Sequence, residues 1–328
     1  MRCFSRREVE GLLDFDELID GVGSAFADLG AGRAAVAPRV GVTADAVGGW
    51  LGCMAASMPR RAILVTKVVS VFPNGPTSGL PTHQAVLVVF DDKTGSPIAL
   101  MDAAYITAVR TAAASAVATR ALARPEARVL AILGTGVQAR SHARVVTRVH
   151  NFDVLLIAGR RRESAEALIA DLRDDLSVPM ESVGFQEAHE RADVICATTN
   201  APNPVVRGAA LRAGVHVNSI GVNRAGREVD ADAIARALLV VDSRNACLGG
   251  VDAAGANDIT WAIRDGVIDA SHIRAELGDI VAGRAEGRTA PDQITLFKSV
   301  GVAVQDAAAA ALVLGAAARD SAGIEVAL

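Results

Sequence analysis

Three small residues in the 328-residue chain have the types and the spacing of a nucleotide-binding turn. Gly134, Gly136 and Ala139 form a G-x-G-x-x-A pattern directly after the apolar run VLAIL and before a predicted helix. The first glycine permits a tight turn, the second lets a pyrophosphate approach the backbone, and the alanine allows close packing of helix on strand. Because the amino end of a helix favours anions, the pattern predicts binding of a dinucleotide cofactor.

Three consecutive arginines, Arg160, Arg161 and Arg162, follow the next apolar run, VLLIAG. An enzyme specific for NAD carries an acidic residue here, which binds the ribose 2′-hydroxyl. A guanidinium instead binds a 2′-phosphate through two hydrogen bonds, so the sequence favours NADP(H) over NAD(H). The alternative is a solvated, arginine-rich loop that binds nothing.

Lys67 and Arg110 are the candidates for binding an anionic substrate. Lys67 lies within the apolar run AILVTKVVSVF, and the neighbours of Arg110 are mostly Ala, Thr and Val. A guanidinium can clamp a carboxylate, and an ammonium can exchange a proton if burial lowers its pKa. Two alternatives stay open: Lys67 faces solvent through strand alternation, or Arg110 extends its charged end to the surface.

The elements expected before residue 125 are two short helices in 7–30, strands at 62–72 and 84–91, and a turn at 91–95. Asp102 is expected to cap a long helix that ends near Leu122, and Pro125 follows it.

From residue 128 the pattern becomes alternating strands and helices. The strands are 129–134, 154–159, 193–198, 216–221 and 237–242, and the helices are 138–148, 163–176, 208–213 and 230–237. Strands that are apolar on both faces indicate an α/β fold with a doubly wound parallel sheet of Rossmann type. Residues 295–318 are expected to form an Ala-rich helix that packs against helix 103–122 and returns the chain to the first domain.

Composition excludes several classes of protein. With 51% hydrophobic and 21% charged residues the chain is too apolar to be disordered. A net charge of −4 without a basic block argues against nucleic acid as a partner. Four separated cysteines, no metal-ligand pattern, no export signal and no membrane span indicate a cytoplasmic protein without a metal site.

Several sequence blocks, taken in order, resemble the ornithine cyclodeaminase/mu-crystallin family. They are KVVSVF with LPTHQ, the helix DAAYITAVRTAAA, ILGTGVQARSHA, and ITLFKSVGVAVQDAAAAAL. The resemblance covers nearly the whole chain. It implies a homodimer with a discontinuous α+β substrate-binding and dimerisation domain (1–122 and 300–328), completed by the C-terminal helix, and a Rossmann domain (123–299).

The resemblance also implies roles for individual residues. Arg39, Lys67 and Arg110 would hold the substrate carboxylate, and Val300 would close the pocket. His83 is open to two interpretations, a general acid or a residue that packs against the cofactor. Besides Gly134 and Gly136, the cofactor contacts would be Thr82, His83, Arg110, Thr111, Val137, Gln138, Arg160, Arg161, Thr198, Gly221, Arg227 and Ser299.

Asn223 is the main departure from the family pattern. Cyclodeaminases carry a catalytic Asp at this position, and an amide cannot take a proton at neutral pH. A neighbouring group such as Asp258 could replace it.

We therefore expect an NADP(H)-dependent oxidoreductase that interconverts an α-imino acid, such as a cyclic ketimine, and an L-amino acid, with Lys67, Arg110 and Asn223 as the candidate catalytic positions. The alternatives are an ornithine- or lysine-type cyclodeaminase with an internally recycled cofactor, and an NADPH-dependent small-molecule binder like the mu-crystallins.

Overall fold

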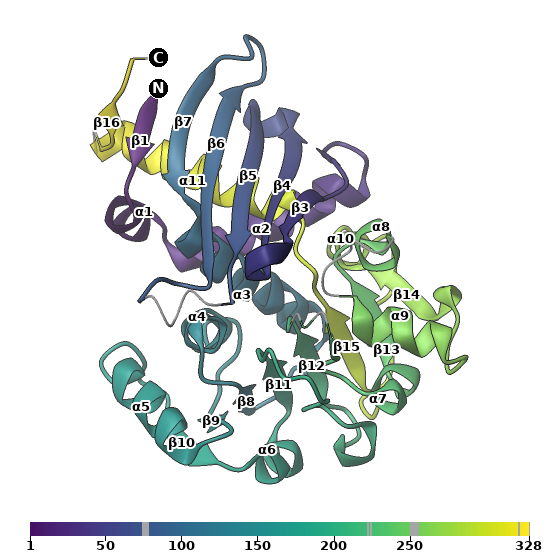
Figure 1. Cartoon of the computed structure of the whole chain (residues 1–328). Helices are drawn as coiled ribbons and strands as arrows, with labels where there is room; N and C mark the ends of the chain where they lie inside the picture. The colour runs from purple at the N-terminus through teal and green to yellow at the C-terminus, as the bar shows by residue number, and fades with distance from the viewer. Residues whose placement is uncertain (74–78, 222, 224, 250–255, 321, 328) are drawn as a thin grey trace. The chain divides into compact units, whose positions relative to one another are not determined.

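The computed structural model describes residues 1–73, 79–221, 223, 225–249, 256–320 and 322–327 (Figure 1). Contacts divide the chain into two compact units. The first unit comprises Met1–Arg110 and Val302–Leu328, and the second unit comprises Thr111–Gly301. One crossing between them lies inside a helix, α3 (Ala103–Leu122), and the other follows Gly301.

The first unit is built on a mixed sheet with the strand order β16-β1-β7-β6-β5-β4-β2, and β3 also pairs with β4. Strand β1 pairs with β16, so the two ends of the chain lie side by side (Figure 1). The strands are β1 (Arg2–Phe4), β2 (Ala35–Val36), β3 (Val40–Ala44), β4 (Gly49–Met58), β5 (Ile63–Val71), β6 (His83–Asp91), β7 (Pro97–Asp102) and β16 (Ile324–Glu325). The helices that belong wholly to this unit are α1 (Arg6–Leu12), α2 (Phe15–Gly30) and α11 (Ala303–Asp320).

Helix α11 packs along α2 and against strands β4 and β5. Its small side chains allow this close approach, and Ala303–Ala310 are all buried. Its most extensive contacts are with α2 and the sheet, whereas it meets the expected partner, helix 103–122, through the bonds of Gln305 and Asp306 with Arg110. The start of α3 agrees with the sequence: the Asp102 carboxylate accepts a hydrogen bond of 2.9 Å from the Tyr105 N–H.

The second unit contains a parallel sheet with the order β10-β9-β8-β11-β12-β15-β13-β14. Its strands are β8 (Val129–Leu133), β9 (Val154–Ala158), β10 (Met180–Val183), β11 (Val194–Ala197), β12 (His216–Ser219), β13 (Leu238–Val241), β14 (Ile273–Glu276) and β15 (Thr295–Lys298). Its own helices are α4 (Val137–Val146), α5 (Arg162–Leu172), α6 (Phe185–Arg191), α7 (Ala231–Arg236), α8 (Arg244–Leu248), α9 (Asn257–Arg264) and α10 (Leu277–Val281). The α/β fold class, with a doubly wound sheet and a domain completed by the C-terminal helix, is confirmed.

The chain moves outward from β8 through β9 to β10 and then returns to β11 on the other side of β8. This change of direction makes the carboxyl ends of β8 and β11 the switch point at which open α/β sheets bind ligands. The sheet core consists of side chains such as Leu133, Leu156, Ile195 and Val217, all fully buried.

Two element predictions were wrong. Residues 208–213 contain only the 3-10 turn Gly208–Ala210, where Gly208 packs so closely on α7 that a Cβ would collide with Asp232 and Ala233. Residues 295–298 form strand β15, inserted between β12 and β13, and not the beginning of the last helix. No helix among the described residues is long and apolar enough to cross a membrane.

Candidate functional site

Lys67 and Arg110 meet on one carboxylate in the interior of the first unit. Lys67 Nζ donates to Asp306 Oδ1 over 3.0 Å, and Arg110 Nε donates to the same oxygen over 3.2 Å. Lys67 points to the buried face of β5, and Arg110 is 5% exposed. Neither alternative holds: Lys67 does not face solvent, and Arg110 does not extend to the surface.

Two further contacts fix these cations. Arg110 Nη1 donates to Gln305 Oε1, and Lys67 Nζ lies 3.2 Å from Thr107 Oγ1. The contacts of Arg110 with Asp306 and Gln305 use its Nε and Nη1. In the described part of the chain Arg110 Nη2 has no acceptor, so it can still donate to a carboxylate.

The Lys67 ammonium can exchange a proton near neutral pH. Burial lowers its pKa most, the Arg110 charge lowers it further, and Asp306 raises it, which leaves the pKa at about 7. A general acid works best when its pKa lies near the working pH. Arg39, half-buried in the segment before β3, also lies near enough to lower the pKa of Lys67.

His83 and Thr82 lie where β6 begins, opposite the end of β5. The Thr82 carbonyl accepts a hydrogen bond of 2.8 Å from the Phe72 N–H, and His83 pairs with Val71. Burial, followed by the charges of Lys67 and Arg110, lowers the pKa of His83 to about 4. The imidazole is therefore neutral at pH 7, which disfavours His83 as a proton donor.

The predicted cofactor residues of the second unit gather at the carboxyl ends of its strands. Gly134 follows β8 with φ of +124°, in the region that favours glycine. A Cβ there would lie 2.7 Å from Oγ1 of Thr198, which follows the neighbouring strand β11. Thr198 is fixed by two hydrogen bonds of 2.9 Å to the Leu133 carbonyl, one from its N–H and one from its hydroxyl.

The amino end of α4 fits the phosphates of a dinucleotide. Its N-cap is Gly136, which provides no capping side chain, and no atom lies within 4 Å of an added Cβ. Val137 is exposed in the first turn, and Gln138 Oε1 is buried without a hydrogen-bond donor from the described protein atoms. Open space, free N–H groups and a positive helix end are what an anion requires.

Arg160 and Arg161 follow β9 and are exposed. Among the described residues neither makes an ion pair, whereas the next residue, Arg162, pairs with Glu166 over 2.8 Å. Two guanidinium groups at this strand end are thus available to an anionic ligand.

Asn223 is held by hydrogen bonds of its side-chain amide. Its Nδ2 donates to the Asn200 carbonyl over 2.9 Å, and its Oδ1 accepts from the Ala225 N–H over 2.9 Å. Both carboxylate oxygens of Asp258 are in contact with protein groups: its Oδ2 lies 2.6 Å from Lys298 Nζ, and its Oδ1 accepts from the N–H groups of Glu228 and Val229.

Gly221 and the segment 299–301 are fixed by buried carboxylates. The Gly221 N–H donates to Glu228 Oε2 over 2.7 Å. Asp242 Oδ2 accepts from the Ser299 hydroxyl and from the N–H groups of Val300 and Gly301, over 3.0, 2.8 and 2.7 Å. These residues follow β12 and β15, so they belong to the same carboxyl edge of the sheet as Gly134.

The remaining predicted residues are Thr111 and Arg227. Thr111 is buried in α3 at the start of the second unit. Arg227 Nη1 lies 3.7 Å from Asp265 Oδ2, and the guanidinium lies over the Trp261 ring, but Nη1 is buried without a hydrogen-bond acceptor among the described residues.

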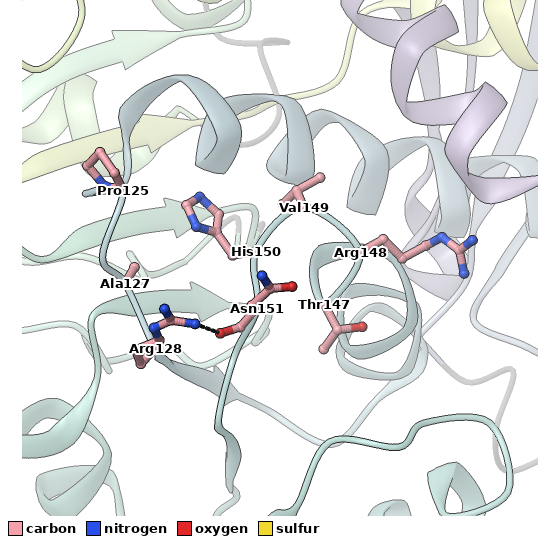
Figure 2. Close-up of a pocket in the computed structure, with 8 residues that line it drawn as sticks. All are labelled: Pro125, Ala127, Arg128, Thr147, Arg148, Val149, His150 and Asn151. Carbon is pink, nitrogen blue, oxygen red and sulfur yellow. Dashed lines mark hydrogen bonds between the residues drawn. The ribbon is translucent and has the colours of Figure 1, made fainter.

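A pocket of about 290 Å³ lies at the opposite, amino-terminal edge of the second sheet (Figure 2). Arg128 Nη1 donates to the Asn151 carbonyl across it, over 2.9 Å, and Arg148 points away from Arg128 and His150 (Figure 2). The lining residues are Pro125, Ala127, Arg128, Thr147, Arg148, Val149, His150 and Asn151. None of them is a predicted site residue.

The sequence interpretation missed Asp306, Gln305, Asp242 and Lys298. The signal for Asp306 was present, because it is a single acid at the beginning of an Ala-rich apolar helix. Asp242 gives a similar signal, because it is an acid that directly follows an apolar strand. A charge inside an apolar segment requires a partner, but the local pattern does not identify it.

Comparison with known proteins decides the family. The family model described as ornithine cyclodeaminase/mu-crystallin family matches residues 2–321. The chain belongs to this family. The resemblance stated from the sequence is confirmed.

Family members of known structure share the fold over the whole chain. The Thermococcus litoralis Δ1-pyrroline-2-carboxylate reductase, in complex with NADH and L-proline, is 37% identical with a TM-score of 0.94, covering 99% of this chain and 100% of that chain. An archaeal alanine dehydrogenase dimer with bound NAD is 30% identical with a TM-score of 0.92, covering 100% and 99%. The mouse ketimine reductase mu-crystallin is 38% identical over 269 residues, 81% of this chain and 80% of that protein.

Proposed function

We propose that this family member is an NAD(P)H-dependent reductase that converts an α-imino acid, such as a cyclic ketimine, into the L-amino acid. The observation that carries the proposal is the buried pair of cations on Asp306. One of them, Arg110, keeps donors for a carboxylate, and the other, Lys67, has a pKa of about 7. The names of the relatives, a ketimine reductase and a pyrroline-2-carboxylate reductase, support the same reaction class.

The chemistry divides between cofactor and protein. The reduced nicotinamide supplies a hydride equivalent to the imine carbon. Lys67 breaks one Nζ–H bond and gives that proton to the imine nitrogen, so the C=N bond becomes CH–NH, and solvent then reprotonates Lys67. Arg110 and Arg39 hold the substrate carboxylate and fix its orientation for both transfers.

The second unit supplies the cofactor residues of the proposal. Gly134, Gly136 and the first turn of α4 would hold the pyrophosphate. We further propose a preference for NADPH, because Arg160 and Arg161 are exposed and make no ion pair among the described residues. The domain boundaries at 122/123 and 299/300 and a homodimeric assembly are part of the same proposal.

Cyclodeamination is disfavoured by Asn223 and Asp258. The first is an amide, and the second is neutralised by Lys298. Neither offers a free carboxylate for acid–base chemistry.

Two parallel assays test the function. Purified protein is given NADPH or NADH with pyrroline- or piperideine-2-carboxylate, and separately L-ornithine or L-lysine with a catalytic amount of NAD(P). We expect oxidation of the cofactor with the imines and no ammonia from the diamino acids. Ammonia release would instead establish a cyclodeaminase, and cofactor binding without turnover in either assay would indicate a binding protein.

Matched variants connect the activity with the site. Lys67→Met should abolish turnover, whereas Lys93→Met, which changes an exposed lysine in a turn, should leave it unchanged. Arg110→Ala should lower kcat/KM by about 10- to 100-fold, since a hydrogen bond to a charged group contributes about 1.5–3 kcal/mol.

A further inference from the structure

Asp306 is the shared partner of the two cations that the proposed reaction uses. Its carboxylate is fully buried near the start of α11, and Oδ1 alone contacts both Lys67 Nζ and Arg110 Nε. Oδ2 has no hydrogen-bond donor among the described protein atoms. The negative charge is therefore directed to the two cations and is not shared with backbone N–H groups.

The surroundings make this charge costly. Apart from Gln305, the residues near Asp306 in α11 are buried alanines and Val304, and Lys67 lies among buried apolar residues of β5. A buried charge without a partner costs several kcal/mol, so neither Asp306 nor Lys67 is stable there alone. The pair stabilises an ammonium in a place where burial would otherwise neutralise it.

We propose that Asp306 is a positioning residue: it holds Lys67 and Arg110 side by side and keeps the Lys67 ammonium charged, so that one cation can bind the substrate carboxylate while the other gives the proton. This inference rests on the reductase function proposed above. In this proposal Asp306 acts through the two cations and does not itself contact the substrate.

Among the described groups that chiefly shift the pKa of Lys67, Asp306 is the acid. Burial and the charges of Arg110 and Arg39 lower the pKa of Lys67, and Asp306 opposes them. Thr107, from α3, is neutral, and the nearby His83, from β6, is uncharged at pH 7. Removing the Asp306 charge should therefore lower the pKa of Lys67 further.

A Gln305 variant distinguishes the orientation of Arg110 from the charge that Asp306 provides. It contacts Arg110 through Oε1, as Asp306 does through Oδ1, but it is neutral. Replacing Gln305 should disturb Arg110 without withdrawing a counter-ion from Lys67.

The chain contains only three lysines, Lys67, Lys93 and Lys298, so the protonation of Lys67 can be measured directly. Carbon-13 labelling at lysine Cε gives three NMR signals, and Lys67→Met assigns one. We expect that signal to titrate near pH 7 in the wild-type protein and lower by about one pH unit or more in Asp306→Asn. An unchanged Lys67 titration in folded Asp306→Asn would overturn the proposal.

Asp28→Asn is the matched control in the same unit. The Asp28 carboxylate also joins two cations, Arg33 and Arg60, through one oxygen, but it contacts neither Lys67 nor Arg110. The Lys67 titration should be unchanged in this variant. If Asp306→Asn does not fold, Arg110→Gln serves instead: it removes the competing cation, so the pKa of Lys67 should rise, and an unchanged value would contradict the shared contact.

Imine reduction gives the second measurement. Because Lys67 must be protonated, kcat/KM falls as the pH rises through its pKa, and in Asp306→Asn this fall should occur at lower pH. A merely structural defect would lower kcat/KM at every pH without shifting the pH at which it falls, and that result would overturn the positioning role. If the wild-type protein reduces no imine, the proposed function fails, while the NMR titration still decides the role of Asp306 in charging Lys67.

Discussion

Lys298 Nζ lies 2.6 Å from Asp258 Oδ2 in the interior of the second unit. Lys298 also donates to the Ser219 hydroxyl and the Gly221 carbonyl, over 3.1 and 2.9 Å. Although burial by itself lowers the pKa of Lys298, Asp258 and Glu228 raise it, so the ammonium is charged. The pair thus joins β15 to α9, and the other two bonds of Lys298 join β15 to the end of β12.

Asp258→Ala should destabilise the protein strongly. Removing one member of a buried ion pair leaves the other charge without compensation, and we expect the free energy of unfolding to fall by about 3–5 kcal/mol. Urea denaturation measures the change. Glu166→Gln, which breaks the exposed pair with Arg162, should cost less than about 0.5 kcal/mol, and a similarly small effect for Asp258→Ala would contradict the structural role.

The two glycines of the nucleotide turn should respond differently to alanine. Gly134→Ala forces a Cβ against Thr198 at a positive φ, so the free energy of unfolding should fall by about 1–3 kcal/mol. Gly136 has φ of −88° and open space, so Gly136→Ala should fold normally. Its methyl group would instead obstruct the cofactor and weaken binding on the order of ten-fold or more. Thermal melting and cofactor titration separate the two effects, and tight binding by Gly136→Ala would place the pyrophosphate elsewhere.

The arginines after β9 should determine the choice between NADPH and NADH. The double variant Arg160→Ser, Arg161→Ser should lose affinity for NADPH by about 10- to 100-fold and change little toward NADH, because in the proposed assignment only the 2′-phosphate would pair with them. Arg162→Ala is the control, since Arg162 already pairs with Glu166. Equal wild-type affinity for both cofactors, measured by fluorescence titration, would rule out this assignment.

His142 should make the protein less stable in acid. It is buried, with Nε2 2.9 Å from Ser115 Oγ and Nδ1 2.8 Å from the Gln138 carbonyl, and burial lowers its pKa to about 4. The unfolded chain binds a proton near pH 6.5, so the contribution is complete above that pH and is lost as the pH falls toward 4. The expected slope is about 1.4 kcal/mol per pH unit for this group.

Urea denaturation between pH 7.5 and pH 4.5 tests the role of His142. His142→Gln should reduce the pH dependence by roughly that slope, because glutamine does not titrate. The same steepness in the variant would show that another group, such as the buried His216, causes the acid sensitivity.

Much of the fold and part of the candidate site could be predicted from local patterns. Gly134, Arg160 and Thr198 each follow a strand that is a short apolar run between helices. The turn after each strand is formed by a few consecutive residues. Lys67 and Arg110 could be singled out because a charge in an apolar segment is costly wherever the segment folds. These features depend on neighbours in sequence, so the sequence alone determined them.

The partners of those charges depended on tertiary structure. Asp306 lies 239 positions after Lys67, and Lys298 of β15 meets Asp258 of α9. Strand β15 was mistaken for helix because four consecutive buried residues have no period that distinguishes strand from helix. Its insertion between β12 and β13 is decided by pairing across the sheet. Pairing and burial bring together residues that are distant in the chain, and no local pattern specifies which of them meet.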